Sequence, residues 1–109
     1  MRKLDVYLND VKAGTLTEQY PGKNYAFQYL AEYVDSPLPP ISVGLPKRNE
    51  VYISEHLFPF FSNMLPEGFN KSVICKSLRI DENDYFGLLY AMADKDFIGA
   101  VNVRKPKND

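Results

Sequence analysis

The residue types that carry most enzymatic chemistry are scarce in this sequence of 109 residues. His56 is the only histidine and Cys75 is the only cysteine. A lone histidine could act as a general base, but its place near a predicted helix start favours a solvated side chain. Cys75 follows Ile74 on a helical segment, which favours a buried thiol over a nucleophile. A histidine cluster for a metal, a cysteine zinc site and an intramolecular disulfide are all excluded.

Two small groups of charged residues are the other candidates for chemistry. Three carboxylates that could ligate a cation are Asp81, Glu82 and Asp84. Three basic residues that could bind a phosphate are Lys71, Lys76 and Arg79. The first spacing is more typical of a helix N-terminus, and the second of a solvated helix face. The six glycines are never closer than eight residues apart, which excludes a phosphate-binding loop and a dinucleotide fingerprint. We therefore expect no catalytic residue, no metal, no cofactor and no enzymatic activity.

The composition indicates a small soluble domain. Apolar residues make up 45% of the sequence and charged residues 25%, and the formal net charge is -1. This balance excludes a disordered chain, and it argues against nucleic acid as the main partner because phosphate contacts need a basic face. No apolar run reaches the ~18 residues of a membrane helix, and we see no secretory signal. We expect one domain over residues 1–103 and a polar tail over 104–109, in the cytoplasm.

Apolar residues at every second position predict strands in the first third of the chain. The two alternating sets are Leu4, Val6 and Leu8, and then Tyr25, Phe27 and Tyr29. A turn at Asn9-Asp10 joins the first strand to residues 11–16 in a hairpin, with a bulge at Gly14. A second turn at 20–22 leads into the aromatic strand. Four prolines between residues 36 and 46 predict an irregular segment, with a short edge strand at 41–43.

Helical spacing replaces this alternation in the second half of the chain. One apolar stripe has the spacing of an amphipathic helix. It consists of Leu57, Phe60, Phe61, Met64 and Leu65. The predicted helix begins near Pro59 and ends at Pro66 and Gly68. Residues 70–78 predict a second helix, whose inward residues are Val73, Ile74 and Leu78.

A capping pattern at Asp81 and Asp84 opens a third predicted helix. Its inward residues are Tyr85, Leu88, Leu89 and Met92. Residues 97–103 predict a closing strand. We therefore expect an α+β fold in which about three helices pack on a small, mostly antiparallel sheet, built from the N-terminal hairpin, further strands and the C-terminal strand.

Two segments together resemble the N-terminal subdomain of the HipA-type kinases. Residues 60–68 read Phe-Phe-Ser-Asn-Met-Leu-Pro-Glu-Gly and are similar to that family's aromatic-Phe-x-Asn-Leu-Leu-Pro-Glu-Gly signature. Residues 83–89, Asn-Asp-Tyr-Phe-Gly-Leu-Leu, and 96–101, Asp-Phe-Ile-Gly-Ala-Val, resemble its second signature. The segment from Pro37 to Pro46 is similar to the family's proline-flanked strand. Ala93 stands where the family often has glycine, which bears only on the geometry of that turn.

The resemblance is to the N-terminal subdomain of these kinases without their catalytic core, and this implies a function. HipA-type proteins continue into a serine/threonine kinase core, and no part of that core is present here. The match therefore resembles a free-standing subdomain of the HipS type, found in three-gene toxin–antitoxin modules. It implies an antitoxin that binds and neutralises a short HipA-like kinase toxin (HipT-like), beside a helix-turn-helix DNA-binding protein (HipB-like). Two alternatives stay open: a non-inhibitory structural subunit that completes a split kinase, and a fragment of a longer kinase.

One turn is the candidate partner-binding site, and it has two interpretations. Its residues, which we call the elbow, are Leu65, Pro66, Glu67, Gly68 and Phe69. In the first interpretation the proline and glycine only end one helix and start the next. In the second the turn protrudes, with Phe69 as an apolar anchor and Glu67 as a charged contact to the kinase. Phe69 lies outside both neighbouring helical stripes, which favours its availability, although it could pack under Val73.

Overall fold

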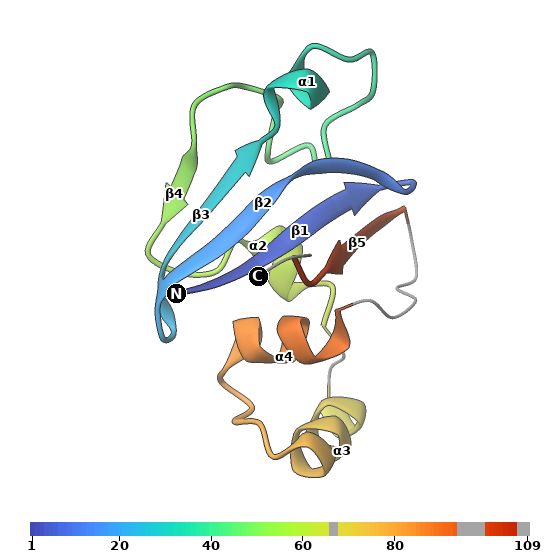
Figure 1. Cartoon of the computed structure of the whole chain (residues 1–109). Helices are drawn as coiled ribbons and strands as arrows, with labels where there is room; N and C mark the ends of the chain where they lie inside the picture. Colours follow the sequence, from blue (N-terminus) through green and yellow to red (C-terminus); the bar gives the residue numbers. More distant parts are fainter. Residues whose placement is uncertain (66–67, 94–99, 107–109) are drawn as a thin grey trace.

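A five-stranded antiparallel sheet forms the frame of the molecule (Figure 1). The computed structural model describes residues 1–65, 68–93 and 100–106, and for residues 68–70 the backbone alone. The strands are β1 (Arg2–Leu8), β2 (Val11–Tyr20), β3 (Lys23–Tyr29), β4 (Tyr52–Ser54) and β5 (Val101–Arg104). Their order across the sheet is β4-β3-β2-β1-β5, and every neighbouring pair is antiparallel. The predicted α+β class, the N-terminal hairpin and the closing C-terminal strand are confirmed.

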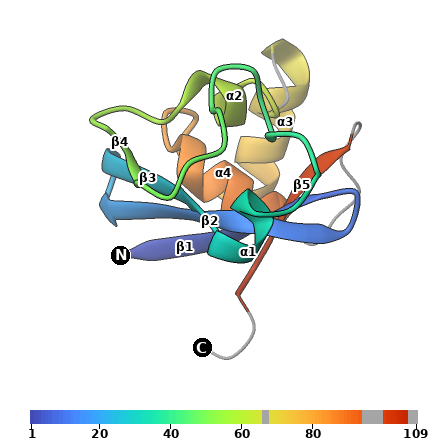
Figure 2. The same ribbon diagram turned by 90° about the horizontal axis from the view of Figure 1, so that it is seen from above.

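Four helices are present among the described residues: α1 (Ala31–Val34), α2 (Pro59–Ser62), α3 (Gly68–Leu78) and α4 (Tyr85–Met92). Figure 2 shows α2, α3 and α4 on the same side of the sheet, while α1 follows β3 at one end of it. In Figure 1, α3 lies beyond α4 at one end of the molecule. None of the helices that the structure describes has the length and apolar character needed to cross a bilayer.

One face of the sheet and the helices above it form the core. Alternate residues of the strands point into it, as their period predicts. The side chains with no exposed surface include, from the sheet, Leu4, Val6, Leu16, Phe27 and Val103. Those from the helices are Phe61, Phe86, Leu88 and Leu89. The aromatic strand predicted from Tyr25, Phe27 and Tyr29 is therefore confirmed, and each of the three rings is buried.

The bulge in the hairpin lies one residue from its predicted position. The pairing of β1 with β2 steps from Val6–Gly14 to Tyr7–Lys12, so Ala13 is the extra residue. The Ala13 carbonyl accepts a hydrogen bond from the Leu30 N–H at 2.8 Å. Gly14 has a different role, because a Cβ on it would lie 2.3 Å from the backbone oxygen of Gln28 on β3. Glycine is required there for close strand approach.

The predicted edge strand at 41–43 is wrong. Ser42 and Leu45 form only an isolated bridge, and Val43 is 97% exposed. The hydroxyl of the buried Tyr29, and not a neighbouring strand, bonds the backbone of this segment. It accepts a hydrogen bond from the Ile41 N–H at 3.1 Å and donates one to the Leu45 carbonyl. The edge of the sheet is β4 instead, which the sequence did not predict.

The helix at Pro59 begins as predicted but is shorter. Phe58 caps it, and α2 ends at Ser62. Tighter turns then continue the chain, with the Leu65 N–H bonded to the Ser62 carbonyl at 3.2 Å. Phe61 and Leu65 are buried, whereas Phe60 is only half-buried. The apolar stripe therefore survives without a continuous α-helix.

The inward faces predicted for the last two helices need correction. On α3, Ile74 packs against the core as predicted, but Val73 is 44% and Leu78 46% exposed, so neither points inward; Cys75 is buried instead. The predicted burial of the thiol is confirmed. On α4, Leu88 and Leu89 are fully buried and Met92 packs against the core, as predicted, but Phe86 is fully buried in place of Tyr85, which is 40% exposed.

The ends of the last helix and strand also differ from their predicted positions. The N-cap of α4 is Asp84, whose carboxylate accepts a hydrogen bond from the Gly87 N–H at 3.0 Å, and not Asp81. Residues 97–99 of the predicted closing strand lie outside the described residues. Arg104, assigned by the sequence to the polar tail, is the last residue of β5.

Candidate functional site

The elbow joins α2 to α3, and only part of it lies within the described residues. Leu65 is 7% exposed and belongs to the core. The backbone of α3 begins at Gly68. Pro66 and Glu67, and the side chain of Phe69, lie outside the part of the chain that the structure describes. The contacts that the sequence assigns to Glu67 and Phe69 therefore stay predictions.

The isolated candidates for chemistry have local structural roles. His56 is exposed and Cys75 is a buried free thiol, as the sequence predicts. The Asp81 carboxylate accepts a hydrogen bond from the Asn83 N–H at 2.8 Å, and Glu82 accepts one from the Ser72 hydroxyl at 3.2 Å. Within the described ranges, no group of three or more acidic, histidine or cysteine residues could hold a metal ion.

A polar cluster on the core face of the sheet was not predicted. Its members are Arg2, Glu18, Tyr25 and Asp84, and Glu18 is only 2% exposed. The Glu18 carboxylate accepts hydrogen bonds from Arg2 Nε at 2.7 Å, from the Tyr25 hydroxyl at 3.1 Å and from the Gly22 N–H at 3.0 Å. The sequence signal that could have predicted the cluster is the position of Glu18 two residues after Leu16 on β2, which puts both side chains on the inward face. A buried carboxylate needs hydrogen-bond or charged partners.

The cluster also anchors the last helix to the sheet. Arg2 Nη2 lies 2.9 Å from the carboxylate of Asp84, the N-cap of α4. Partial burial alone would raise the pKa of Asp84, but the hydrogen bonds from Arg2 and Gly87 and the charge of Arg2 outweigh it and lower that pKa. Burial, together with the charge of Glu18, raises the pKa of Tyr25 to about 12. Each group is paired, so this cluster stabilises the fold and offers no reactive group.

The C-terminal half of α3 and the residue after it expose two apolar and two basic side chains. We call these residues the α3 surface: Val73, Lys76, Leu78 and Arg79. Arg79 has φ +56°, and the Ile80 N–H bonds the Cys75 carbonyl at 2.9 Å, a helix-ending arrangement that usually has glycine at this position. Lys71, the third basic residue of the predicted patch, lies elsewhere, with its Nζ 4.6 Å from the Tyr85 ring centroid.

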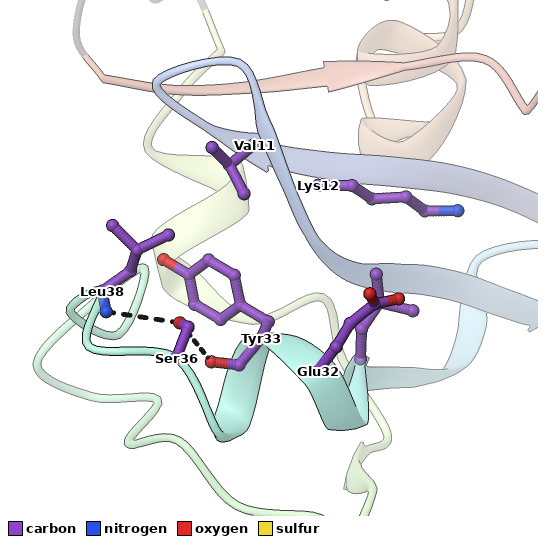
Figure 3. Close-up of a pocket in the computed structure, with 7 residues that line it drawn as sticks. Val11, Lys12, Glu32, Tyr33, Ser36 and Leu38 are labelled. Carbon is purple, nitrogen blue, oxygen red and sulfur yellow. Dashed lines mark hydrogen bonds between the residues drawn. The ribbon is translucent and has the colours of Figure 1, made fainter.

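A shallow pocket of about 340 Å³ lies between the first hairpin and α1 (Figure 3). Apolar side chains form most of its lining: Val11, Leu30, Tyr33 and Leu38. Its polar lining is Lys12, Glu32 and Ser36. The sequence did not predict this pocket, because α1 and the segment after it have no clear apolar period.

Three comparisons place this geometry among known proteins. A family model described as HipA N-terminal domain matches residues 4–104. A protein of Haemophilus influenzae strain Rd, described as an uncharacterized protein, is 32% identical over 107 residues, which are 98% of this chain and 95% of that protein. A solved structure described as the N-terminal domain of HipA toxin has 27% sequence identity and a TM-score of 0.74, over 100% of this chain and 96% of that chain.

Proposed function

The chain belongs to the HipA N-terminal domain family, and on this premise we propose that it is a binding module that inhibits a short HipA-like serine/threonine kinase toxin. The observation that carries the proposal is the extent of the match. Family similarity covers residues 4–104, which is nearly the whole sequence, and it is similarity to an N-terminal domain. The Haemophilus influenzae relative has almost no sequence outside its match to this chain, so that relative consists of little more than this domain.

An antitoxin of this kind acts by binding, and it needs a surface rather than a reactive centre. By the resemblance to HipA-type kinases, the domain packs beside a kinase core in longer relatives and so has a surface shaped for one. As a separate protein it binds in trans, and its effect then depends on its concentration. The paired state of the polar cluster and the lone, buried Cys75 support a role without catalysis or cofactor.

The elbow and the adjoining α3 surface are the proposed contact region. Val73 and Leu78 expose apolar area that the fold does not cover, and Lys76 and Arg79 are exposed basic residues on the same part of the chain. Val73 and Leu78 lie about 140° apart around the helix axis, so a partner would contact them from different sides of α3. A stable complex would bury on the order of 1,600 Å² in total, so this region and neighbouring surfaces would be needed together. Phe69 is the proposed anchor of this interface.

The wider partners follow from the same proposal. A HipB-like helix-turn-helix protein would complete a ternary complex and supply the DNA contacts, because this chain has a formal net charge of only -1. Direct nucleic-acid binding by this protein is not expected. The complex would act in the cytoplasm, where the kinase toxin finds its substrate.

Co-expression with a cognate short HipA-like kinase tests the proposal. We expect the protein to restore growth that the kinase alone arrests, and to co-purify with it. Co-purification without rescue of growth would favour the alternative, a structural subunit of a split kinase. Absence of any complex would refute both.

A matched pair of variants tests the anchor. Phe69→Ala should weaken kinase binding at least thirtyfold, because truncation of a central aromatic anchor costs ~2 kcal/mol or more, while the melting temperature stays almost unchanged. Tyr20→Ala removes another aromatic ring, 60% exposed at the C-terminal end of β2, and should leave both quantities unchanged. A large fall in the melting temperature of Phe69→Ala would mean that this ring is part of the core, since a buried Phe costs ~3–5 kcal/mol when truncated.

A further inference from the structure

We propose that the pocket beside α1 receives a lysine or arginine side chain of a protein partner. The site is separate from the elbow and the α3 surface, and the proposal does not depend on the inhibitory function. Its two requirements are an apolar wall for the aliphatic stem and an unpaired carboxylate for the cationic end. Both are present within one pocket of about 340 Å³.

The apolar wall is formed by Val11, Leu30 and Leu38, which are exposed or half-buried, beside the buried Tyr33 ring. Figure 3 shows Val11 and Leu38 at one end of the pocket, with the Tyr33 ring between them and the charged residues. Val11 is 44% exposed, although it is a β-branched apolar residue next to a turn. Tyr33 itself is fixed: its hydroxyl donates to the Pro39 carbonyl at 2.7 Å and its ring stacks on Tyr29 at 5.8 Å. The wall is therefore preformed.

The charge of the pocket follows from which polar groups already have partners. Lys12 Nζ lies 3.3 Å from the Asp5 carboxylate and points away from the Tyr33 ring. The Ser36 hydroxyl donates to the Tyr33 carbonyl at 2.6 Å and accepts from the Leu38 N–H at 3.3 Å. Glu32 is exposed and has no ion pair or hydrogen bond among the described residues. Among the residues that line the pocket, Glu32 is therefore the charged group without a partner; the nearby Lys47 ammonium is held by the Ser36 carbonyl at 2.6 Å and lies 5.6 Å from the Tyr33 ring centroid.

The shape and the charge together select the occupant. A lysine or arginine side chain has an apolar stem of three or four methylenes and a terminal cation, and such side chains bury the stem along apolar surface while the charge reaches a polar edge. The volume is near the lower limit of ~300–1,000 Å³ for ligand sites, which fits one side chain better than a cofactor. A free diamine fits less well, because its second ammonium would have no acceptor in the pocket.

Backbone amide NMR of the purified protein tests the assignment with three blocked tripeptides that differ in their central residue: lysine, arginine or norleucine. Norleucine has an apolar stem without the charge. We expect saturable shifts at Leu30, Glu32 and Leu38 for the two basic peptides, with Kd in the millimolar range, and weaker binding of the norleucine peptide. Putrescine serves as the free-amine control and should bind more weakly than the basic peptides.

Two variants separate the stem from the charge. Glu32→Gln should weaken the basic peptides about two- to fivefold, the range for one exposed ion pair, and leave the norleucine peptide unchanged. Val11→Ser should weaken all three, and Glu55→Gln, an exposed acid after β4, should weaken none. Non-saturable shifts, shifts centred elsewhere, equal affinity for the lysine and norleucine peptides, tighter binding of putrescine, or no effect of Glu32→Gln would each overturn the proposal.

Discussion

Replacing Glu18 with alanine removes the central acceptor of the polar cluster, and the structure allows its cost to be worked out group by group. Tyr25 is 4% exposed, so its hydroxyl loses a buried acceptor, which costs ~1–3 kcal/mol. Arg2 is 34% exposed and keeps its contact with Asp84. The loss of the ion pair between Arg2 and Glu18 therefore costs at most ~1 kcal/mol. The Gly22 N–H is exposed and can bond to water. We expect a total destabilisation of about 3 kcal/mol.

The comparison with Asp84 makes this prediction specific. Asp84→Ala removes an N-cap, which costs ~1 kcal/mol, and one end of an ion pair whose two side chains are each 34% exposed, which adds ~0–1 kcal/mol. Glu18→Ala should therefore be the more harmful of the two. For a domain of this size ~1 kcal/mol corresponds to ~4 °C in melting temperature, so we expect falls of about 12 °C for Glu18→Ala and about 4–8 °C for Asp84→Ala.

Thermal and urea denaturation followed by circular dichroism measure these differences, with Glu55→Ala as the exposed control. The double variant Glu18→Ala/Tyr25→Phe provides the decisive arm. If the stranded hydroxyl dominates the cost, Tyr25→Phe should recover part of the lost stability in the Glu18→Ala background, although it is destabilising in the wild type. The reasoning fails if Glu18→Ala is no worse than Glu55→Ala, or if Tyr25→Phe recovers nothing.

Three further predictions follow from single contacts. The pKa of Asp84 is lowered from 3.8 in the folded chain, so the stability that its carboxylate contributes is complete well above pH 3.8 and is lost as the pH falls through the folded-state pKa. The urea midpoints at pH 7 and pH 3 should therefore differ less for Asp84→Asn than for the wild type. An equal difference for the two proteins would contradict this prediction. Gly14→Ala should destabilise by more than ~1 kcal/mol, since its Cβ would lie 2.3 Å from the Gln28 backbone oxygen, and an unchanged urea midpoint would show that the strands separate freely. Arg79→Gly should stabilise by up to ~1 kcal/mol, because φ +56° at a helix end is free of strain only for glycine, and a lower melting temperature would show that the arginine side chain makes a stabilising contact.

Local patterns in the sequence were sufficient for the elements whose stability is local or repeated. Alternation predicted β1 and the aromatic residues of β3, because strand side chains point to opposite faces at every step. Asn9 and Asp10 both adopt positive φ between paired Leu8 and Val11, as a two-residue hairpin turn requires. Pro59 predicted the start of α2, since proline fits the first helical turn without losing a hydrogen bond.

Elements that depend on tertiary contacts were missed or misplaced. α1 has four residues, too few for a clear period or for stability alone, and α2, whose start was predicted, ends at Ser62 and not at Pro66. The loop at 41–45 is shaped by the Tyr29 hydroxyl, which is 12 residues away from Ile41 in sequence. Val73 was predicted to face inward because α3 was assumed to lie on the sheet, whereas it lies beyond α4 (Figure 1).

The candidate sites divide in the same way. The elbow was found from a short motif, and the family assignment followed from that motif and its spacing, because family signatures are contiguous in sequence. The polar cluster joins Arg2 to partners 16 and 82 residues away, and the pocket beside α1 joins the first hairpin to a segment about 20 residues later. Periodicity reports which face a residue occupies and not which distant residue shares that face. The sequence alone therefore determined the α+β class and the family resemblance, and only the tertiary structure decided which charges are paired and where an unpaired carboxylate meets an apolar wall.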